Sequence, residues 1–298
     1  MKNYLVLDFG GTSVKCAVMN ECAEFVEQFT LPSHADSYPK WLHMFSSHFK
    51  RCQKQYEVQG IAISTCGAVD VESGVIHGSS ALPYIHGIDI KTLYEDKFGV
   101  TTELENDACC AALAESWLGK GKNSNHFCSV VVGSGIGGAI VTQQKIQKGH
   151  HLHGGEFGFA IQGYVNGKPK ILGHVASTQA LVDAAADQLG IDKSQLNGLD
   201  VFNLYDQQHD EIQLIVHNWF SELAIGLFNI QYHIDPELIV IGGAISQRPN
   251  LVSQINNKLD GIMAALPHAT VYPKLEASKF GNNANLIGAL KHFLNRQG

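Results

Sequence analysis

The chain has few of the features that mark membrane, secreted or nucleic-acid-binding proteins. No apolar run approaches the roughly 20 residues that a membrane-spanning helix needs. No apolar segment with a small-residue cleavage site follows Met1, and Lys and Arg form no run in a chain of formal net charge −7. Because binding to a polyanion usually needs a basic surface, we expect no nucleic acid as partner. The missing apolar segments lead us to expect a cytoplasmic protein with no membrane as partner.

Cysteines at disulfide- or metal-forming spacing are also missing. The seven cysteines all lie between Cys16 and Cys128, and no C-x-x-C pair occurs among them. This argues against a disulfide framework and against a cysteine-rich zinc site. We expect most of these cysteines to be small, buried apolar side chains.

Length and composition indicate a globular protein with more than one domain. The chain has 298 residues, of which 45% are hydrophobic and 16% are charged. Single hydrophobic cores stop growing at about 250–300 residues, so the length favours two domains.

The first part of the chain has the pattern of three strands, a helix and a further strand. Apolar runs predict strands over 3–8, 14–19, 25–31 and 58–64. Apolar residues at helical spacing predict a helix over 38–53 with Ser37 as a possible N-cap. Three strands in a meander before the first helix differ from a simple doubly wound sheet.

The remainder repeats this outline. Helical spacing predicts helices over 108–118 and 209–233, the second ended by Pro236. Apolar runs predict strands over 127–132, 138–142 and 238–241. Two halves with a strand, a glycine-rich turn and another strand predict two similar lobes around a ligand cleft. No pattern is readable from about 160 to 208.

One segment between the first two strands combines an acid, glycines, a hydroxyl and a cation, in the order Asp8, Gly10, Gly11, Thr12 and Lys15. Glycines let backbone N–H groups approach an anion, and Thr12 and Lys15 add a donor and a positive charge. Asp8 could hold a metal ion through water. A tight β-turn would explain the glycines alone, but the combination favours a phosphate site.

A second glycine-rich segment follows the predicted strand at 127–132 and consists of Gly133, Ser134, Gly135, Ile136, Gly137 and Gly138. It fits another phosphate cradle. A dinucleotide fingerprint would open a helix, whereas this segment continues into a strand, which disfavours a Rossmann site. Hairpins also use glycines, so this signal is weak by itself.

Asp107 and Asn106 stand at the start of a predicted helix. Asp107 could act as a general base at the edge of a cleft, with Asn106 binding a neutral polyol. Either residue could instead be the helix N-cap. Farther along, Glu156 lies in a glycine-rich stretch where its carboxylate could reach hydroxyl groups. The histidines at 150, 151 and 153 lack an evident fourth ligand, which favours a polar loop over a metal site.

In this order, the segments resemble the ROK family (repressors, open reading frames and kinases) of the actin-like, hexokinase-type ATPases, over almost the whole chain. Residues 8–15 match the family motif D-x-G-G-T-x-x-K, and residues 105–108 match E-N-D-A. Residues 133–139 resemble the second phosphate motif, with Ser134 in place of Thr. Residues 241–244 resemble the adenosine-side motif, and residues 283–289 the closing helix.

The resemblance implies an ATP-dependent kinase, with Mg²⁺ as cofactor, that phosphorylates a hexose of the glucose, mannose or N-acetylmannosamine type at its 6-hydroxyl. Asp107 would be the catalytic base. The sugar would be bound by Asn106, Glu156 and Gly67. The implied ATP- and phosphate-binding residues are Asp8, Gly10, Gly11, Thr12, Lys15, Gly133, Ser134, Gly135, Gly137, Gly138, Gly242 and Gly243. Asp8 would also hold Mg²⁺ through water.

The implied fold is an α/β, two-lobed actin-like or hexokinase-type (ribonuclease H-like) ATPase. Its smaller N-terminal lobe would comprise 1–105 plus 281–298, and its larger lobe 106–280, with nucleotide and sugar between them. The family resemblance also implies a homodimer.

Three positions depart from the family pattern. Phe159 stands at the family's sugar- and zinc-binding His, and the downstream cysteine-rich zinc motif is absent. The position near Gly173 lacks a sugar-contacting Glu, and Cys66 replaces the Pro of the P-G-x-V-D turn. The chain therefore resembles a zinc-free branch that includes β-glucoside kinases and streptococcal-type hexose kinases. A β-glucoside is the alternative substrate, and no zinc site is expected.

Two alternatives belong to other functional classes. A sugar-responsive transcriptional repressor would carry an N-terminal helix-turn-helix domain, for which we expect no room before Asp8, and repressors often lose the phosphate motif that is intact here. A sugar-binding protein without turnover would be expected to lack Asp107, which is present. Both comparisons favour an enzyme.

Overall fold

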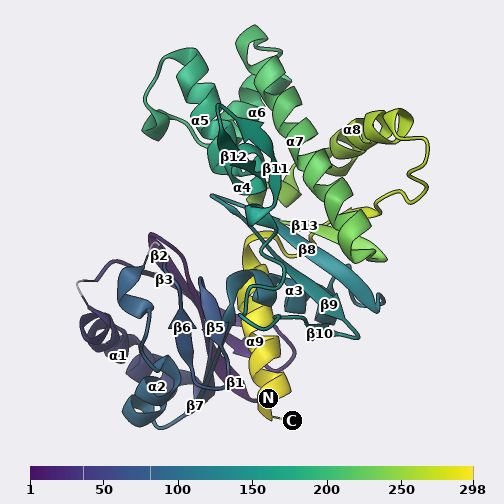
Figure 1. The fold of residues 1–298 in the computed structure, drawn as a ribbon. Helices are drawn as coiled ribbons and strands as arrows, with labels where there is room; N and C mark the ends of the chain where they lie inside the picture. The colour runs from purple at the N-terminus through teal and green to yellow at the C-terminus, as the bar shows by residue number, and fades with distance from the viewer. Residues whose placement is uncertain (36, 81, 298) are drawn as a thin grey trace. The chain divides into compact units, whose positions relative to one another are not determined.

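The computed structural model describes residues 1–35, 37–80 and 82–297. The chain divides into two compact units, which are coloured along the sequence in Figure 1. Unit 1 comprises Met1–Gly119, Lys148–His153 and Asn283–Gly298, and unit 2 comprises Lys120–Gln147 and Gly154–Asn282. The lobe boundaries given above stay a prediction, and three residues within them (36, 81 and 298) lie outside the described part.

Unit 1 is built on a five-stranded mixed sheet of order β3-β2-β1-β4-β7. The first three strands pair antiparallel, whereas β1 with β4 and β4 with β7 pair parallel. The strands are β1 (Asn3–Phe9), β2 (Ser13–Asn20), β3 (Phe25–Pro32), β4 (Val58–Thr65) and β7 (Thr101–Asn106). The predicted meander and the predicted strand after the first helix are thereby confirmed.

Helices cover both faces of this sheet. They are α1 (Tyr38–Tyr56), α2 (Ile90–Phe98), α3 (Asp107–Leu118) and α9 (Ala284–Gln297). Leu5 and Leu7 of β1 share a core with Trp41 of α1, whereas the ring of Tyr4 lies 5.1 Å from that of Phe293 in α9. Successive side chains of a strand point to opposite faces, so α1 and α9 lie on opposite sides of β1. Helix α3 packs against α9.

Unit 2 has a second five-stranded sheet with the same topology, in the order β10-β9-β8-β13-β14. Its strands are β8 (His126–Val132), β9 (Ile136–Thr142), β10 (Lys145–Ile146), β13 (Leu238–Gly242) and β14 (Leu275–Ala277). As in unit 1, the first three strands pair antiparallel and the later two are added parallel. The two halves that the sequence indicated therefore contain similarly connected sheets.

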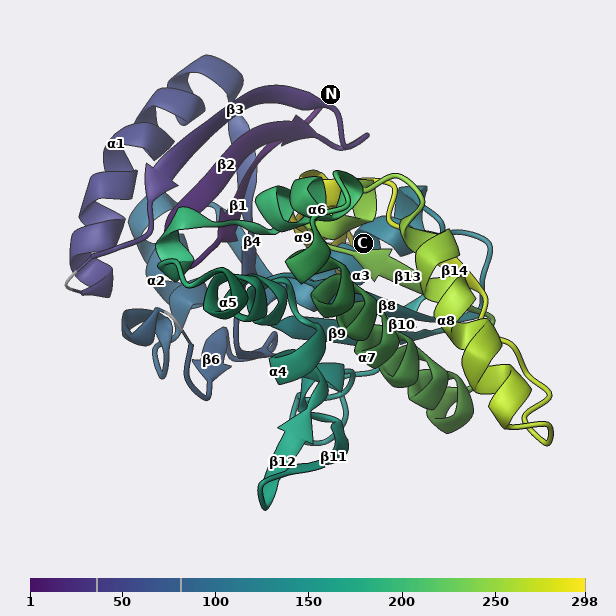
Figure 2. The ribbon, with the colours of Figure 1, turned by 90° about the horizontal axis from the view of Figure 1, so that it is seen from above.

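The helices of unit 2 pack around α7 (Asp210–Ile234), which is predicted nearly to the residue and ends at Asp235 in the left-handed conformation, just before Pro236. The other helices are α4 (Leu172–Ala176), α5 (Thr178–Leu189), α6 (Gly198–Asp206) and α8 (Leu251–Ala265). A hairpin of β11 (Ile161–Val165) and β12 (Lys168–Ile171) extends away from α4 (Figure 2).

The remaining small elements of unit 1 follow the turn after β4. They are the hairpin of β5 (Ala68–Asp70) and β6 (Val75–His77) and a short helical turn at Pro83–Ile85. None of the helices in the described part of the chain combines the length and apolar character that crossing a membrane would require.

Candidate active site

The turn between β1 and β2 is closed by a backbone hydrogen bond and begins just after the buried carboxylate of Asp8. The N–H of Gly10 donates to the carbonyl oxygen of Ser13 over 3.0 Å, and residues 10–12 are exposed. Asp8, at the end of β1, is 5% exposed. Its Oδ1 accepts hydrogen bonds from Ser64 Oγ (2.8 Å) and Asn285 Nδ2 (3.1 Å), from β4 and α9. The predicted turn thus presents open backbone next to a fixed carboxylate.

Lys15 on β2 is paired with Asp8 on β1, so it brings a positive charge to the same place. Its Nζ lies 3.8 Å from Asp8 Oδ2 in the register where these two residues face each other across β1 and β2. The lysine side chain is 45% exposed while the Asp8 side chain is 7% exposed. A partly exposed ammonium beside the exposed backbone of residues 10–12 suits a phosphate group.

The donor set at Asp8 fits Mg²⁺ that is bound together with a nucleotide. Within residues 1–35, 37–80 and 82–297, no group of three or more His, Cys, Asp or Glu side chains could form a metal cage. Mg²⁺ usually keeps several waters and uses one or two carboxylates plus substrate phosphates, so a single carboxylate such as Asp8 is sufficient.

Asn106 and Asp107 have different local roles at the start of α3. Asn106 is the N-cap, because its Oδ1 accepts the N–H of Cys109 over 3.1 Å. Its Nδ2 donates to the carbonyl oxygen of Gly67 over 3.1 Å. Asp107 is the first helical residue, and its Oδ1 accepts the N–H of Ala108 over 2.8 Å. Of the two predicted capping candidates, Asn106 therefore caps the helix.

The turn at Gly67 connects β4 to β5 and lies against Asn106. Gly67 has φ of 97°, and its carbonyl oxygen is the acceptor for Asn106. Burial raises the pKa of the neighbouring Cys66 thiol; a hydrogen bond with Ser80 acts in the opposite direction, and the Asp107 carboxylate raises the pKa further. Cys66, Ser80 and Asp107 thus share one polar neighbourhood in unit 1.

Ser80 and His86 in this neighbourhood were not predicted from the sequence. Ser80 Oγ lies 2.8 Å from His86 Nε2 and accepts the N–H of Leu82 over 3.2 Å. His86 Nδ1 is buried, and within the residues that the structure describes it has no hydrogen-bond partner. The sequence signal available was only a Ser-Ser pair before Leu82, which is common in loops.

The second glycine-rich segment is the turn between β8 and β9, as predicted. The N–H of Gly133 donates to the carbonyl oxygen of Gly135 over 2.9 Å, and the carbonyl of Gly133 accepts the N–H of Thr178 over 2.8 Å. Apart from the adjoining residues in the chain, no atom of the described residues lies within 4 Å of a Cβ built on Gly133 or Gly135. The first part of this turn therefore borders open space.

A pocket of ≈ 530 Å³ in unit 2 begins at this turn. It is lined by three parts of the chain: Gly133 and Ser134 of the turn, Ala244 after β13, and residues from the stretch that had no readable pattern, among them Thr178, Gln179, Lys193 and Asn197. Helix α5 starts at the pocket, with Ser177 as its N-cap. The size and mixed lining suit a nucleotide-sized ligand.

Gly243 follows the end of β13 and directly precedes Ala244, which lines the pocket. It has φ of 87° and ψ of 175°, a conformation that is essentially restricted to glycine. A Cβ at this position would stand 2.2 Å from the carbonyl oxygen of Val132. The pair Gly242-Gly243 thus allows the end of β13 to lie directly against the end of β8, next to Ala244 of the pocket wall.

Glu156 is held in a frame of glycines that pack on β9. Gly155 has φ of 92°, and a Cβ there would stand 2.7 Å from Ala139 Cα and 2.8 Å from the carbonyl oxygen of Gly138. A Cβ on Gly158 would stand 2.2 Å from the carbonyl oxygen of Ile136. Close backbone packing on both sides fixes Glu156, which is half-buried, near the end of the second glycine-rich turn.

Phe159 and Gly173 both lie next to Gly158 of this frame, Phe159 as the following residue in the chain and Gly173 in space. The Phe159 side chain is 68% exposed. A Cβ on Gly173 would stand 3.3 Å from the carbonyl oxygen of Gly158, so Gly173 lies against the backbone that carries Glu156. Neither residue supplies a polar side chain there.

The three histidines before Glu156 form a small exposed group. The rings of His150 and His151 are 4.6 Å apart, and His153 Nδ1 lies 2.6 Å from the carbonyl oxygen of His151. We predict well under one zinc per chain when tag-free protein is analysed for metals, and no fall in melting temperature with a strong chelator, because a zinc site needs about four ligands. Stoichiometric, tightly held zinc would contradict this prediction.

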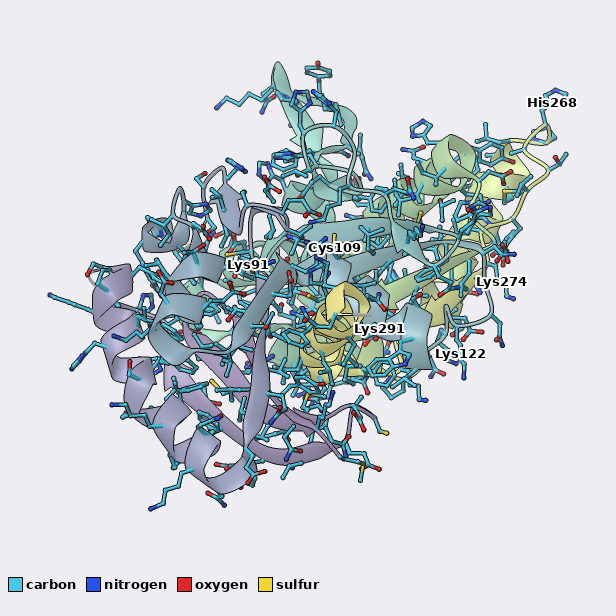
Figure 3. The ribbon with its side chains drawn as sticks, turned by 90° about the horizontal axis from the view of Figure 1, so that it is seen from below. Lys91, Cys109, Lys122, His268, Lys274 and Lys291 are labelled. Atoms are coloured by element: carbon cyan, nitrogen blue, oxygen red, sulfur yellow. The ribbon has the colours of Figure 1, made fainter. Side chains whose placement is uncertain are left out.

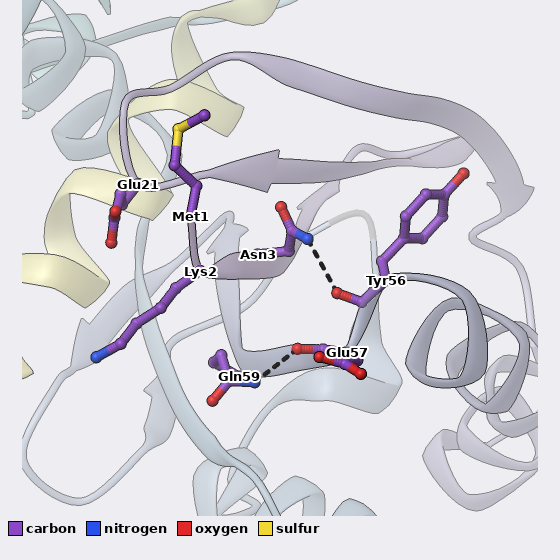
Figure 4. Close-up of a pocket in the computed structure, with 7 residues that line it drawn as sticks. All are labelled: Met1, Lys2, Asn3, Glu21, Tyr56, Glu57 and Gln59. Atoms are coloured by element: carbon purple, nitrogen blue, oxygen red, sulfur yellow. Dashed lines mark hydrogen bonds between the residues drawn. The ribbon is translucent and has the colours of Figure 1, made fainter.

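A second hollow in unit 1, of ≈ 460 Å³, holds none of the predicted site residues. Figure 4 shows it at the N-terminus, beside the end of α1. Two side-chain amides in its lining donate to nearby carbonyl oxygens, Asn3 to that of Tyr56 (2.9 Å) and Gln59 to that of Glu57 (2.7 Å).

Comparison with known proteins places the chain in a family. The sequence profile of the ROK family matches residues 4–296. A β-glucoside kinase from Klebsiella pneumoniae is 30% identical over 292 residues, which cover 96% of this chain and 94% of that protein. A solved ROK family protein from Streptococcus pneumoniae, in complex with sucrose, is 30% identical, has a TM-score of 0.90 and covers 99% of each chain.

The fold is shared more widely. A ROK family glucokinase from Streptomyces griseus, solved in complex with glucose and AMPPNP, is 21% identical with a TM-score of 0.81, and the match covers 99% of this chain and 100% of that chain. The fold is therefore that of the actin-like, hexokinase-type ATPases, as predicted. Within this class, the chain belongs to the ROK family.

Proposed function

We propose that the chain is an ATP-dependent kinase that transfers the γ-phosphoryl group to the 6-hydroxyl of a hexose of the glucose, mannose or N-acetylmannosamine type. The observation that carries the proposal is the division of roles at the start of α3. Asn106 caps the helix and is fastened to the Gly67 turn, so the carboxylate of Asp107 is not needed as the cap. A fixed carboxylate beside a polar pair such as Cys66 and Ser80 suits a general base.

In the proposed reaction, Asp107 accepts the proton of the sugar's 6-hydroxyl as that oxygen attacks the γ-phosphorus. A new O–P bond forms, the bond between the γ-phosphorus and the bridging oxygen breaks, and ADP leaves with the electron pair. Phosphoryl transfer depends mainly on positioning and on stabilisation of charge. Asn106, Glu156 and the Gly67 turn would hold the sugar ring so that the 6-hydroxyl meets Asp107.

The phosphates would be held by backbone N–H groups of the two glycine-rich turns, with Thr12 and Lys15 adding a hydroxyl and a cation. Asp8 would hold Mg²⁺ through water, and the ion would neutralise phosphate charge when bound. The pocket at Gly133 and Ala244 would take the nucleoside. The intact phosphate motif favours this kinase over the repressor alternative. The dimer and the cytoplasmic location stay predictions.

A β-glucoside kinase is the second candidate, and two observations favour it. The relative from Klebsiella pneumoniae carries that description at 30% identity. In addition, the residues at the positions where the family reads the anomeric side of the sugar are an exposed ring, Phe159, and a residue without a side chain, Gly173. An apolar, open wall would leave room for an aglycone.

The same two residues lead to a prediction about specificity. A site that hydrogen-bonds a hydroxyl strongly rejects analogues without it, whereas an apolar wall discriminates by only about 1–3 kcal/mol. We therefore expect kcat/KM for 2-deoxyglucose and mannose to lie within about 200-fold of that for glucose, with galactose much poorer. A loss of more than about a thousandfold for 2-deoxyglucose would contradict the apolar wall.

The experiment for the proposed function is an ADP-release assay with ATP and a panel of glucose, mannose, N-acetylmannosamine and a methyl β-glucoside. Sugar-dependent ADP release with at least one of them is the expected result. A high rate with the methyl β-glucoside and little with free hexoses would select the second candidate. ADP release that does not depend on any of these sugars would contradict both.

A further inference from the structure

One short segment, Lys148–His153, belongs to unit 1 although the residues on either side of it belong to unit 2. It leads to Glu156. The side chain of its first residue, Lys148, reaches the end of β7, just before Asn106 and Asp107. The Lys148 side chain is 19% exposed. A lysine that is largely buried in this way usually has a partner of opposite charge.

The partner is Glu105, the last residue before Asn106. Lys148 Nζ lies 2.5 Å from Glu105 Oε1 and also donates to the carbonyl oxygen of Val69 over 2.8 Å. The Glu105 side chain is 3% exposed. Burial raises the pKa of Glu105, and the Lys148 ammonium acts in the opposite direction, which favours the carboxylate.

The same carboxylate oxygen also determines where α3 begins. Glu105 Oε1 accepts the backbone N–H of Asn106 over 2.6 Å. Lys148 therefore connects to the helix start in two bonds, from its ammonium to Glu105 and from Glu105 to Asn106. Lys148 donates to the carbonyl oxygen of Val69, just as Asn106 donates to that of Gly67. Both hydrogen bonds connect the end of β7 to the turn and strand that follow β4, the first of them through Glu105.

The second oxygen of Glu105 faces a histidine rather than another cation. His292 Nδ1 lies 3.8 Å from Glu105 Oε2. Burial and the neighbouring Lys148, Arg296 and Lys91 lower the pKa of His292 to about 3, so its ring is neutral at physiological pH. His292 does not replace the positive charge of Lys148.

We propose that Lys148 is a positioning residue for the reaction, which acts through Glu105 and the Asn106 amide to fix Asp107. This rests on the proposed function, and it adds a residue that no motif of the sequence indicated. Removal of the ammonium would leave Glu105 buried and unpaired, or protonated, and would loosen its hold on Asn106. A misplacement of about 1 Å at a reacting group can lower the rate about 100-fold.

The matched control is another buried lysine–glutamate pair, whose glutamate lies on the same strand. Lys91, labelled in Figure 3, lies on α2, and its Nζ is 2.8 Å from Oε1 of Glu103, which is two residues before Glu105 on β7. Both side chains of that pair are also largely buried: Lys91 is 21% exposed and Glu103 is 5% exposed. Because Glu103 Oε2 also lies 3.5 Å from Arg296 Nε, Lys91→Met leaves Glu103 with a cation. The two variants are therefore compared in kcat, which a purely structural role of Lys148 would leave unchanged in both.

The test measures kcat, KM for ATP and the melting temperature of Lys148→Met, Lys148→Arg and Lys91→Met. We expect kcat to fall about 100-fold in Lys148→Met, with KM for ATP within about twofold of wild type, and to recover at least tenfold in Lys148→Arg. In Lys91→Met, kcat should stay within about threefold even if the melting temperature falls. Equal kcat values for Lys148→Met and Lys91→Met would overturn the proposal.

Two further measurements test the proposal independently. A double variant tests it if Lys148→Met folds poorly, and amide hydrogen exchange tests it if the substrate is not among the sugars of the panel. The double variant Lys148→Met with Glu105→Gln removes both charges of this pair, and the amide oxygen of Gln can still accept the Asn106 N–H. We therefore expect kcat to recover to within about tenfold of wild type. A double variant as slow as Lys148→Met would contradict action through Glu105. Amide hydrogen exchange over residues 106–111 needs no substrate. It should accelerate in Lys148→Met and not in Lys91→Met, and unchanged exchange would overturn the proposal even if wild-type protein phosphorylated no sugar.

Discussion

Replacement of Asp107 by Asn should lower kcat by roughly 10²–10⁴, because a positioned general base contributes about that factor. Asn keeps the shape of the side chain and an oxygen that can accept the N–H of Ala108, as Asp107 Oδ1 does over 2.8 Å. The start of α3 should therefore remain intact, since the cap is Asn106. The change removes the ability to accept a proton and little else. Steady-state kinetics with the best sugar of the panel measure it.

A capping aspartate in the same unit is the control. Asp89 is the N-cap of α2, and its side chain accepts the N–H of Thr92 over 2.9 Å. Asp89→Asn should leave kcat within about twofold, because Asn and Asp are about equally good caps. Near-full activity of a correctly folded Asp107→Asn would assign Asp107 to helix stability and not to catalysis.

Gly243→Ala should destabilise unit 2 and weaken ATP binding together. A non-glycine residue in the conformation of Gly243 costs about 1–3 kcal/mol, and the added Cβ would stand 2.2 Å from the carbonyl oxygen of Val132. The contact involves backbone on both sides, so the ends of β13 and β8 must separate. We expect a loss of more than about 2 kcal/mol in the free energy of unfolding and a higher KM for ATP.

Gly261→Ala is the matched control for this change. Gly261 is an exposed residue within α8, and apart from its chain neighbours and the backbone of its own helix no described atom lies within 4 Å of a Cβ built there. Because Ala favours a helix over Gly by about 1 kcal/mol, this variant should be slightly more stable than wild type. Denaturant unfolding of both variants compares them. Equal stability of Gly243→Ala and wild type would contradict the packing at the end of β13.

Local patterns in the sequence were sufficient for the elements whose residues carry their own signal. The run from Tyr4 to Leu7 is apolar without interruption because β1 is buried on both faces, under α1 and α9. The long helix α7 has apolar residues at steps of three and four along its buried side. The phosphate-type turn at Asp8 combines residue types that rarely occur together by chance, and the turn is formed as predicted.

Elements and residues whose role depends on distant partners were not predictable in this way. The short helices α4, α5 and α6 lie between 160 and 208. Each of them buries only a few residues, so none has an apolar periodicity long enough to predict a helix. Ser80 and His86 matter through a hydrogen bond and the proximity of Cys66, which only the folded turn creates.

Lys148 shows the same limit more sharply. In the sequence it is one lysine in a polar loop, between Gln147 and Gly149. Its proposed role depends on the ion pair with Glu105, which is 43 positions away, and on the burial of both side chains. Charge pairs across such a separation leave no periodic pattern, whereas a motif such as residues 105–108 is readable because its members are neighbours.

Phosphorus NMR of the reaction with ATP and the best sugar of the panel tests the central claim most directly. We predict that each ATP consumed yields one ADP and one sugar phosphate, with the ester phosphorus coupled to the two protons on C6. ADP accompanied only by inorganic phosphate, or an ester at another carbon of the sugar, would contradict it.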